Sequence, residues 1–199
     1  MKKKALLSSA LSTALVATAI GAPTLAKSDD KSTDKRAVQV MQLNPQTNPA
    51  KAGENEQIQE SIKKGDVQTA KPKESTSVEI QSTTEQVGIE AYSKLFDFTF
   101  EGVSYTGMNS RNFDVTGTDV EIDSRAWTSN GENKSGTYYI TLYRNHWYGD
   151  DKLTTVKYFY GPDKTIYYYQ WTGVGKGSYH FNIKCEETLI SGDGSVLQQ

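Results

Sequence analysis

The side chains that could do chemistry are few, and His146 comes first. It lies in the stretch RNHWYGDD, a short distance before Asp150 and Asp151. An imidazole beside carboxylates could transfer a proton or hold a metal ion. The neighbouring Trp147 and Tyr148 indicate the alternative, a loop that binds a ligand through its aromatic rings. We expect the binding loop, and no catalytic residue, metal site or cofactor.

Cys185 is the only cysteine of the chain, so it cannot close an internal disulfide. His180 lies an odd number of residues away on the same expected strand, where such residues point to opposite faces, which argues against a thiolate–imidazole pair. We expect Cys185 to be buried and unreactive, with an intermolecular disulfide or a nucleophilic role as the alternatives. The alternation around His180 predicts that it points to solvent together with Asn182 and Lys184.

Three carboxylates share one face of the stretch DVEIDSR, namely Asp119, Glu121 and Asp123. Clustered oxygen ligands are what Ca²⁺ prefers. The same spacing is typical of a strand with one apolar and one solvated face, and we expect the solvated face. No GxSxG stretch is present, so the nucleophile of an α/β-hydrolase has no place here. An enzyme is the less favoured class.

The first residues, 1–26, have the pattern of a bacterial secretory signal peptide. Three lysines precede an uncharged stretch, and small residues stand before Lys27. An uncleaved membrane anchor is the alternative. Removal of Lys2, Lys3 and Lys4 changes the formal net charge from −2 to −5, which does not favour nucleic acid as a partner. We expect an extracellular protein whose mature chain does not insert stably into a membrane.

Residues 27–88 are rich in Lys, Glu, Gln, Ser and Thr and contain no aromatic residue. This composition is typical of a flexible linker or disordered arm. A spacer through the cell wall or a cleaved propeptide are functional alternatives. ENEQIQESIKKG could form a helix ending at Gly65, but Ile58 and Ile62 alone do not hold a helix in water.

Residues 89–199 contain all the aromatic residues, arranged in short alternating runs separated by turn residues such as Asn130-Gly131 and Gly161-Pro162. This pattern predicts an all-β domain, an antiparallel β-sandwich or small barrel of about eight short strands. The runs KYFY and TIYYY, joined by GPDK, should form a hairpin.

The stretch TIYYYQW has large aromatic side chains on both faces. A two-layer protein buries one face of each sheet, so some rings must be exposed, and each forgoes about 1.5–3 kcal/mol of burial. A ligand platform, a protein interface or cross-strand pairing without a ligand would each explain them. We expect a secreted, non-enzymatic module that binds a carbohydrate or a cell-surface protein; the alternative is a bacteriocin-like or toxin-like protein acting on a target envelope. The expected ligand-binding residues are Trp147, Tyr148, Tyr167, Tyr169 and Trp171.

Overall fold

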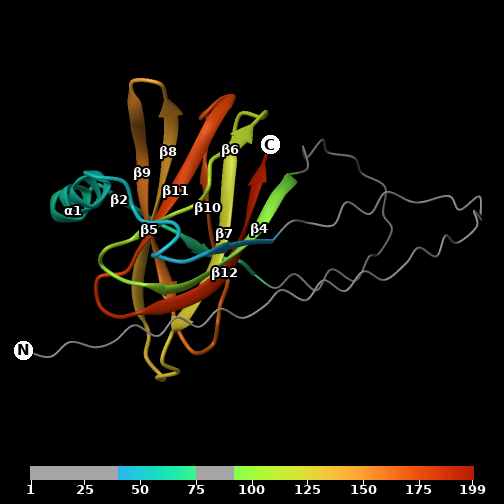
Figure 1. Ribbon diagram of the computed structural model, residues 1–199. Coiled ribbons are helices and arrows are strands. Elements are labelled where there is room, and N and C mark those ends of the chain that lie inside the picture. The colour runs from blue at the N-terminus through green and yellow to red at the C-terminus, as the bar shows by residue number, and fades with distance from the viewer. Residues whose placement is uncertain (1–39, 75–91) are drawn as a thin grey trace, which may run out of the picture. The chain divides into compact units, whose positions relative to one another are not determined.

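Strands make up most of the computed structural model, which describes residues 40–74 and 92–199 (Figure 1). The first part contains β1 (Val40–Leu43), α1 (Glu54–Lys64), β2 (Val67–Thr69) and β3 (Lys71–Pro72). The second part contains β4 (Ser93–Val103), β5 (Met108–Asn109), β6 (Phe113–Val115), β7 (Val120–Thr128), β8 (Gly136–His146), β9 (Gly149–Tyr160), β10 (Tyr167–Trp171), β11 (Gly177–Lys184) and β12 (Ile190–Gln198). The predicted all-β class is confirmed. The predicted signal peptide lies outside the described residues.

The strands belong to one mixed sheet, in the order β1-β4-β12-β7-β9-β8-β11-β5, with the short strands β2, β3, β6 and β10 attached to it. β1 runs parallel to β4 and β2 runs parallel to β9, whereas most other pairs are antiparallel. The long strands curl the sheet into a nearly closed barrel. Phe96 of β4 and Phe113 of β6 pack edge to face at 5.3 Å although these strands do not pair. The small barrel is therefore the better of the two predicted architectures, whereas the antiparallel sandwich of about eight strands is wrong, because one mixed, curled sheet of twelve described strands encloses the core.

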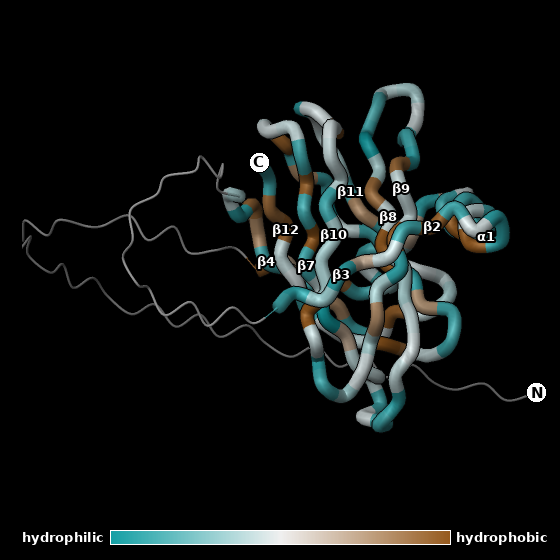
Figure 2. The backbone as a smooth tube through the Cα atoms, turned by 180° about the vertical axis from the view of Figure 1, so that it is seen from behind, coloured by the Kyte–Doolittle hydropathy of each residue, from teal (hydrophilic) through white to brown (hydrophobic). Residues whose placement is uncertain are grey.

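The interior of this barrel takes up many of the aromatic side chains. Apolar and polar residues follow one another along the strands, as alternation requires (Figure 2). Tyr138 and Tyr158 are fully buried, and their hydroxyls donate to Ser124 Oγ at 2.8 Å and to the carbonyl of Ile122 at 2.9 Å. Each buried hydroxyl has an acceptor, so these tyrosines serve as core residues.

The segment expected as a flexible arm contributes to the fold between residues 40 and 74. β1 adds a strand to the sheet beside β4. The next element is α1, and its Ile58 is fully buried. Gly65 ends α1 with φ +72°, as its position in the sequence predicts. The helix is stable because it packs on the barrel, which composition alone does not reveal. Residues 27–39 and 75–88 of the expected arm lie outside the described residues.

β9 and β10 do not form the predicted hairpin. After the turn at Gly161–Lys164, where Lys164 has φ 52°, β10 crosses to pair antiparallel with β7 and β3. Strand β9 instead pairs with β8 and β2.

Among the described residues, no helix is both long and apolar enough to span a bilayer.

Candidate functional site

The tip of the β8–β9 hairpin carries two of the three most exposed aromatic residues among those the structure describes, and the third is Tyr105 in another loop. Trp147 is 95% exposed and Tyr148 is 64% exposed, and both lie between the last residue of β8 and the first of β9. Both belong to the set that the sequence predicted. Two rings exposed to water forgo the free energy of burial, and a ligand that covered them would supply it.

The aromatic rings at this tip contact one another. The imidazole of His146 stacks on the ring of Tyr148, with centroids 4.9 Å apart and planes 11° apart. Trp147 packs edge to face on Tyr148 at 5.5 Å. His146 Nε2 lies 3.0 Å from a carboxylate oxygen of Asp151, which fixes the imidazole in turn. His146, Trp147 and Tyr148 therefore form one group of mutually contacting rings at the tip.

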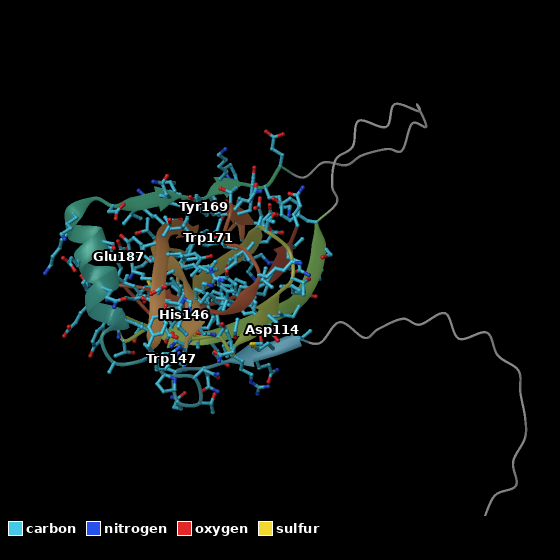
Figure 3. The ribbon with its side chains drawn as sticks, turned by 90° about the horizontal axis from the view of Figure 1, so that it is seen from above. Asp114, His146, Trp147, Tyr169, Trp171 and Glu187 are labelled. Carbon is cyan, nitrogen blue, oxygen red and sulfur yellow. The ribbon has the colours of Figure 1, made fainter. Side chains whose placement is uncertain are left out.

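The three predicted residues of β10 lie elsewhere and point inward. Trp171 is 3% exposed, and its indole N–H donates to the carbonyl of Thr154 at 3.1 Å. Tyr169 packs edge to face on Trp171 at 4.9 Å, and Tyr167 lies 5.2 Å from Phe159. Figure 3 shows Tyr169 and Trp171 on a different side of the barrel from Trp147. The structure therefore does not bring the five predicted residues into one surface.

The other face of β10 is turned outward, where Tyr168 is half-buried and Ile166, just before the strand, is exposed. The ammonium group of Lys73 lies 6.0 Å from the centre of the Tyr168 ring. Alternation correctly assigned the residues of TIYYYQW to two faces. It did not show which face the core would take, because both carry aromatic rings.

The predicted exposure of His180, Asn182 and Lys184 is wrong, because all three are buried. They lie on the outer face of the barrel wall, near the start of α1 and the segments beside it. Asn182 donates to Asn109 Oδ1 at 2.8 Å, and Lys184 forms an ion pair with Glu186 at 2.9 Å. Both faces of β11 are thus buried, one by the core and the other by polar neighbours.

Glu54 and His180 form the centre of this buried polar group. His180 Nε2 lies 2.9 Å from Glu54 Oε1, and His180 Nδ1 lies 2.5 Å from Asn145 Oδ1. The second oxygen of Glu54 accepts hydrogen bonds at 2.8 Å from the Asn109 amide and from the backbone N–H of Lys51. Burial raises the pKa of Glu54, but the hydrogen bonds from His180, Asn109 and Lys51 outweigh it and hold the pKa below its ordinary value. Glu54 is therefore a buried, ionised acceptor.

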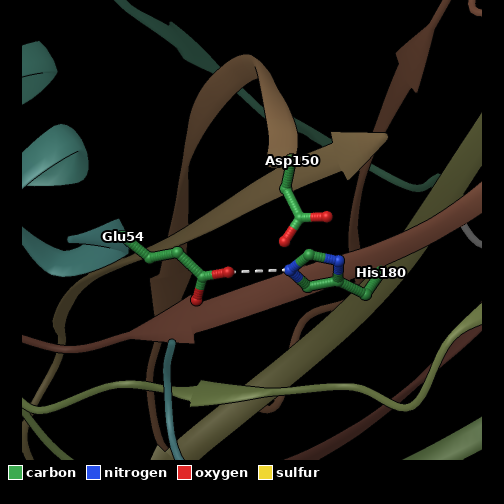
Figure 4. A group of neighbouring side chains, drawn as sticks. All are labelled: Glu54, Asp150 and His180. Carbon is green, nitrogen blue, oxygen red and sulfur yellow. Dashed lines mark hydrogen bonds and ion pairs between the residues drawn. The ribbon is translucent and has the colours of Figure 1, made fainter. Parts of the chain in front are cut away.

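Asp150, the second residue of β9, completes a group of three possible metal ligands with Glu54 and His180 (Figure 4). One donor atom from each lies within 4.8 Å of the others. The carboxylate of Asp150 also pairs with the ammonium of Lys51 at 2.6 Å. Sequence analysis missed this group because Glu54 stands 126 positions before His180 in a stretch of polar composition. No local pattern could connect them.

The carboxylates of the stretch DVEIDSR are less solvated than predicted. Glu121 is buried, and Lys73 forms ion pairs with it at 3.4 Å and with Asp123. Asp119 accepts hydrogen bonds from the Gln170 amide at 2.8 Å and from the backbone N–H of Gly173 at 3.0 Å. Lys73, just after β3, Gln170 of β10 and the turn after β10 supply these partners, which the isolated spacing did not show.

Cys185 is buried, as predicted, and forms no disulfide among the described residues. Burial raises the pKa of its thiol, which further lowers the fraction of reactive thiolate at neutral pH.

Comparisons with protein-family models, with curated proteins and with solved structures found no match. Function is therefore inferred from the geometry of the described residues.

Proposed function

We propose that the protein is a secreted, non-enzymatic binding module that contacts a carbohydrate of a cell surface through Trp147 and Tyr148. The observation that supports this proposal best is the exposure of the Trp147 indole, 95%, at the tip of an ordered hairpin. A ring this exposed contributes nothing to the core and is free to make contact with another molecule.

Sugar rings present flat apolar faces edged by hydroxyl groups. A flat indole can stack on such a face, while neighbouring polar groups bind the hydroxyls. The tip offers both kinds of contact: the Trp147 ring is open, and the Tyr148 hydroxyl and the Asp151 carboxylate stand close to it in the chain. This combination favours a carbohydrate over a purely apolar ligand.

The stacking of His146 on Tyr148 supports the same proposal. Because the two rings are already in contact and His146 is tied to Asp151, binding orders fewer side chains than it would at a flexible loop. The acidic net charge of the chain favours a neutral glycan over an anionic one. The expected secretion would place the module where such glycans occur.

Retention on insoluble glycan tests the proposal. The mature chain is incubated with purified peptidoglycan and with chitin, and the bound fraction is compared between wild type and the double variant W147A/Y148A. We expect retention of the double variant to fall by about 10-fold or more, as for removal of two central contact residues. The matched control is Y105A, which removes a ring of similar exposure, 67%, from a different loop; it should bind like wild type.

Two results would overturn the proposal. One is equal retention of wild type and W147A/Y148A, with circular dichroism showing that both are folded. The other is binding to whole cells that disappears when the cells are treated with protease, while neither glycan retains the protein. That second result would identify a surface protein as the target of the same tip.

A further inference from the structure

The group of Glu54, Asp150 and His180 joins three elements that are far apart in the chain. Glu54 is the first residue of α1, Asp150 lies near the start of β9, and His180 lies in β11. Figure 4 shows both carboxylates directed toward the imidazole. With donor atoms within 4.8 Å of one another, two carboxylates and one imidazole converge on one small volume.

Tyr143 packs against this group and carries a buried hydroxyl without a partner among the described residues. Tyr143 is almost fully buried, and its ring stacks on His180 with centroids 5.0 Å apart. Its hydroxyl oxygen has no hydrogen-bond partner among the described residues. Burial, and then the charges of Glu54 and Asp150, raise the pKa of this hydroxyl. Buried hydroxyl groups are normally bonded, so an unpartnered one on the ring that stacks on His180 needs an explanation.

We propose that Glu54, Asp150 and His180 bind a divalent first-row transition-metal ion, with Zn²⁺ as the reference ion. The imidazole favours such an ion over Ca²⁺ or Mg²⁺, which prefer oxygen ligands alone. His180 Nδ1 is held by Asn145, which leaves Nε2 directed at Glu54 as the donor atom. The ion takes the place of the proton on Nε2, and that proton leaves to solvent.

The distances suit an ion of this size. Donor atoms of a tetrahedral zinc site lie about 3.4 Å apart, given metal–donor distances of about 2.1 Å. Glu54 Oε1 and His180 Nε2 lie 2.9 Å apart, slightly closer than this. Binding therefore requires small movements of side chains and no rearrangement of strands.

The ion has a path into the site along Lys51 and Asp150. The side chain of Asp150 is 20% exposed and that of Lys51 is 48% exposed, whereas Glu54 and His180 are closed off. The Lys51 ammonium now pairs with Asp150, so it competes with an incoming cation for the same carboxylate. Removing the ammonium should strengthen metal binding.

Calorimetric titration tests the proposal with the whole mature chain, first freed of metal with EDTA. Zn²⁺ is added to wild type and to D150N, and Co²⁺ is added in parallel so that its visible absorption reports the coordination geometry. We expect one Zn²⁺ per chain in wild type and an affinity about 10-fold or more lower in D150N. Asp150 is the informative position because its carboxylate is partly exposed, so D150N should remain folded. K51M should bind Zn²⁺ more tightly than wild type.

Two neighbours provide matched controls. D151N removes an adjacent carboxylate, and H146N removes the other histidine, which pairs with Asp151 at the hairpin tip. Both should keep wild-type affinity. The proposal is overturned if wild type binds no Zn²⁺ at one ion per chain, if D150N and D151N bind equally well, or if H146N abolishes binding. D150N changes the buried group of Glu54, Asp150 and His180, whereas H146N changes the hairpin tip. Failure of zinc binding would therefore leave the carbohydrate proposal standing.

Discussion

The carboxylate of Glu54 and the imidazole of His180, 126 positions apart in the sequence, lie 2.9 Å from each other beneath the start of α1. This contact ties the first described segment of the chain to the barrel. Asn109 and the backbone N–H of Lys51 bind the same carboxylate. The polar stretch before residue 75 is therefore anchored by a buried charge as well as by Ile58.

Glu54→Ala tests the importance of that charge. Its removal leaves the imidazole of His180, the amide of Asn109 and the N–H of Lys51 without their acceptor, and we expect a loss of about 3 kcal/mol in the free energy of unfolding. Denaturant unfolding in the presence of EDTA measures it. Glu56→Ala is the control, because Glu56 is exposed in the same helical turn and should change the stability by less than about 0.5 kcal/mol. Equal effects of the two substitutions would contradict the assigned role of Glu54.

Ile58→Ala tests whether α1 is packed on the barrel. Ile58 is fully buried, so the substitution removes packed methyl groups and should cost about 2–4 kcal/mol. A free, solvated helix would tolerate the change with almost no loss. Thermal unfolding measured by circular dichroism distinguishes the two outcomes, and Lys63→Ala on the exposed side of α1 serves as the reference.

Sequence reasoning reached the all-β class because alternation and turn residues are local signals. It also divided the residues of a strand correctly between its two faces, as in TIYYYQW. It could not show what covers each face, since that depends on segments distant in the chain: α1 and its flanking segments supply partners to His180, and β3 and β10 cover Glu121. The burial of Trp171 follows from the crossing of β10 to β7, which the short turn GPDK did not indicate.

The two tryptophans of the predicted ligand set should respond in opposite ways to substitution. Trp171→Ala removes a buried side chain and should destabilise the protein by about 3–5 kcal/mol. Trp147→Ala removes an exposed one and should change stability by no more than about 0.5 kcal/mol. Chemical denaturation of both variants provides the comparison. A large loss of stability in Trp147→Ala would show that the hairpin tip is part of the core packing.

Glu121 should make stability depend on pH. Burial and the nearby charge of Asp123 raise its pKa above 4.5, and the ion pair with Lys73 only partly offsets them. The folded state therefore holds the proton more tightly than the unfolded state. This contribution is fully present below pH 4.5 and is lost as the pH rises through the pKa of the folded state.

Glu121→Gln imitates the protonated side chain and should raise the melting temperature at pH 7, with little difference from wild type near pH 4. Glu101→Gln, at an exposed position of β4, controls for the change in net charge. Melting curves at the two pH values measure the difference. A lower melting temperature for Glu121→Gln at pH 7 would mean that the ion pair with Lys73 outweighs burial.

The contact between Trp147 and a sugar is tested most directly by tryptophan fluorescence during titration with soluble peptidoglycan fragments and with chitohexaose. The emission of the wild-type chain should change and saturate with one of these ligands, because the exposed indole passes from water into a stacked contact. W127F, which changes a half-buried tryptophan of β7, should keep this response, and W147F should lose it. A response that persists in W147F, or no response of wild type to either ligand, would contradict the proposed binding surface.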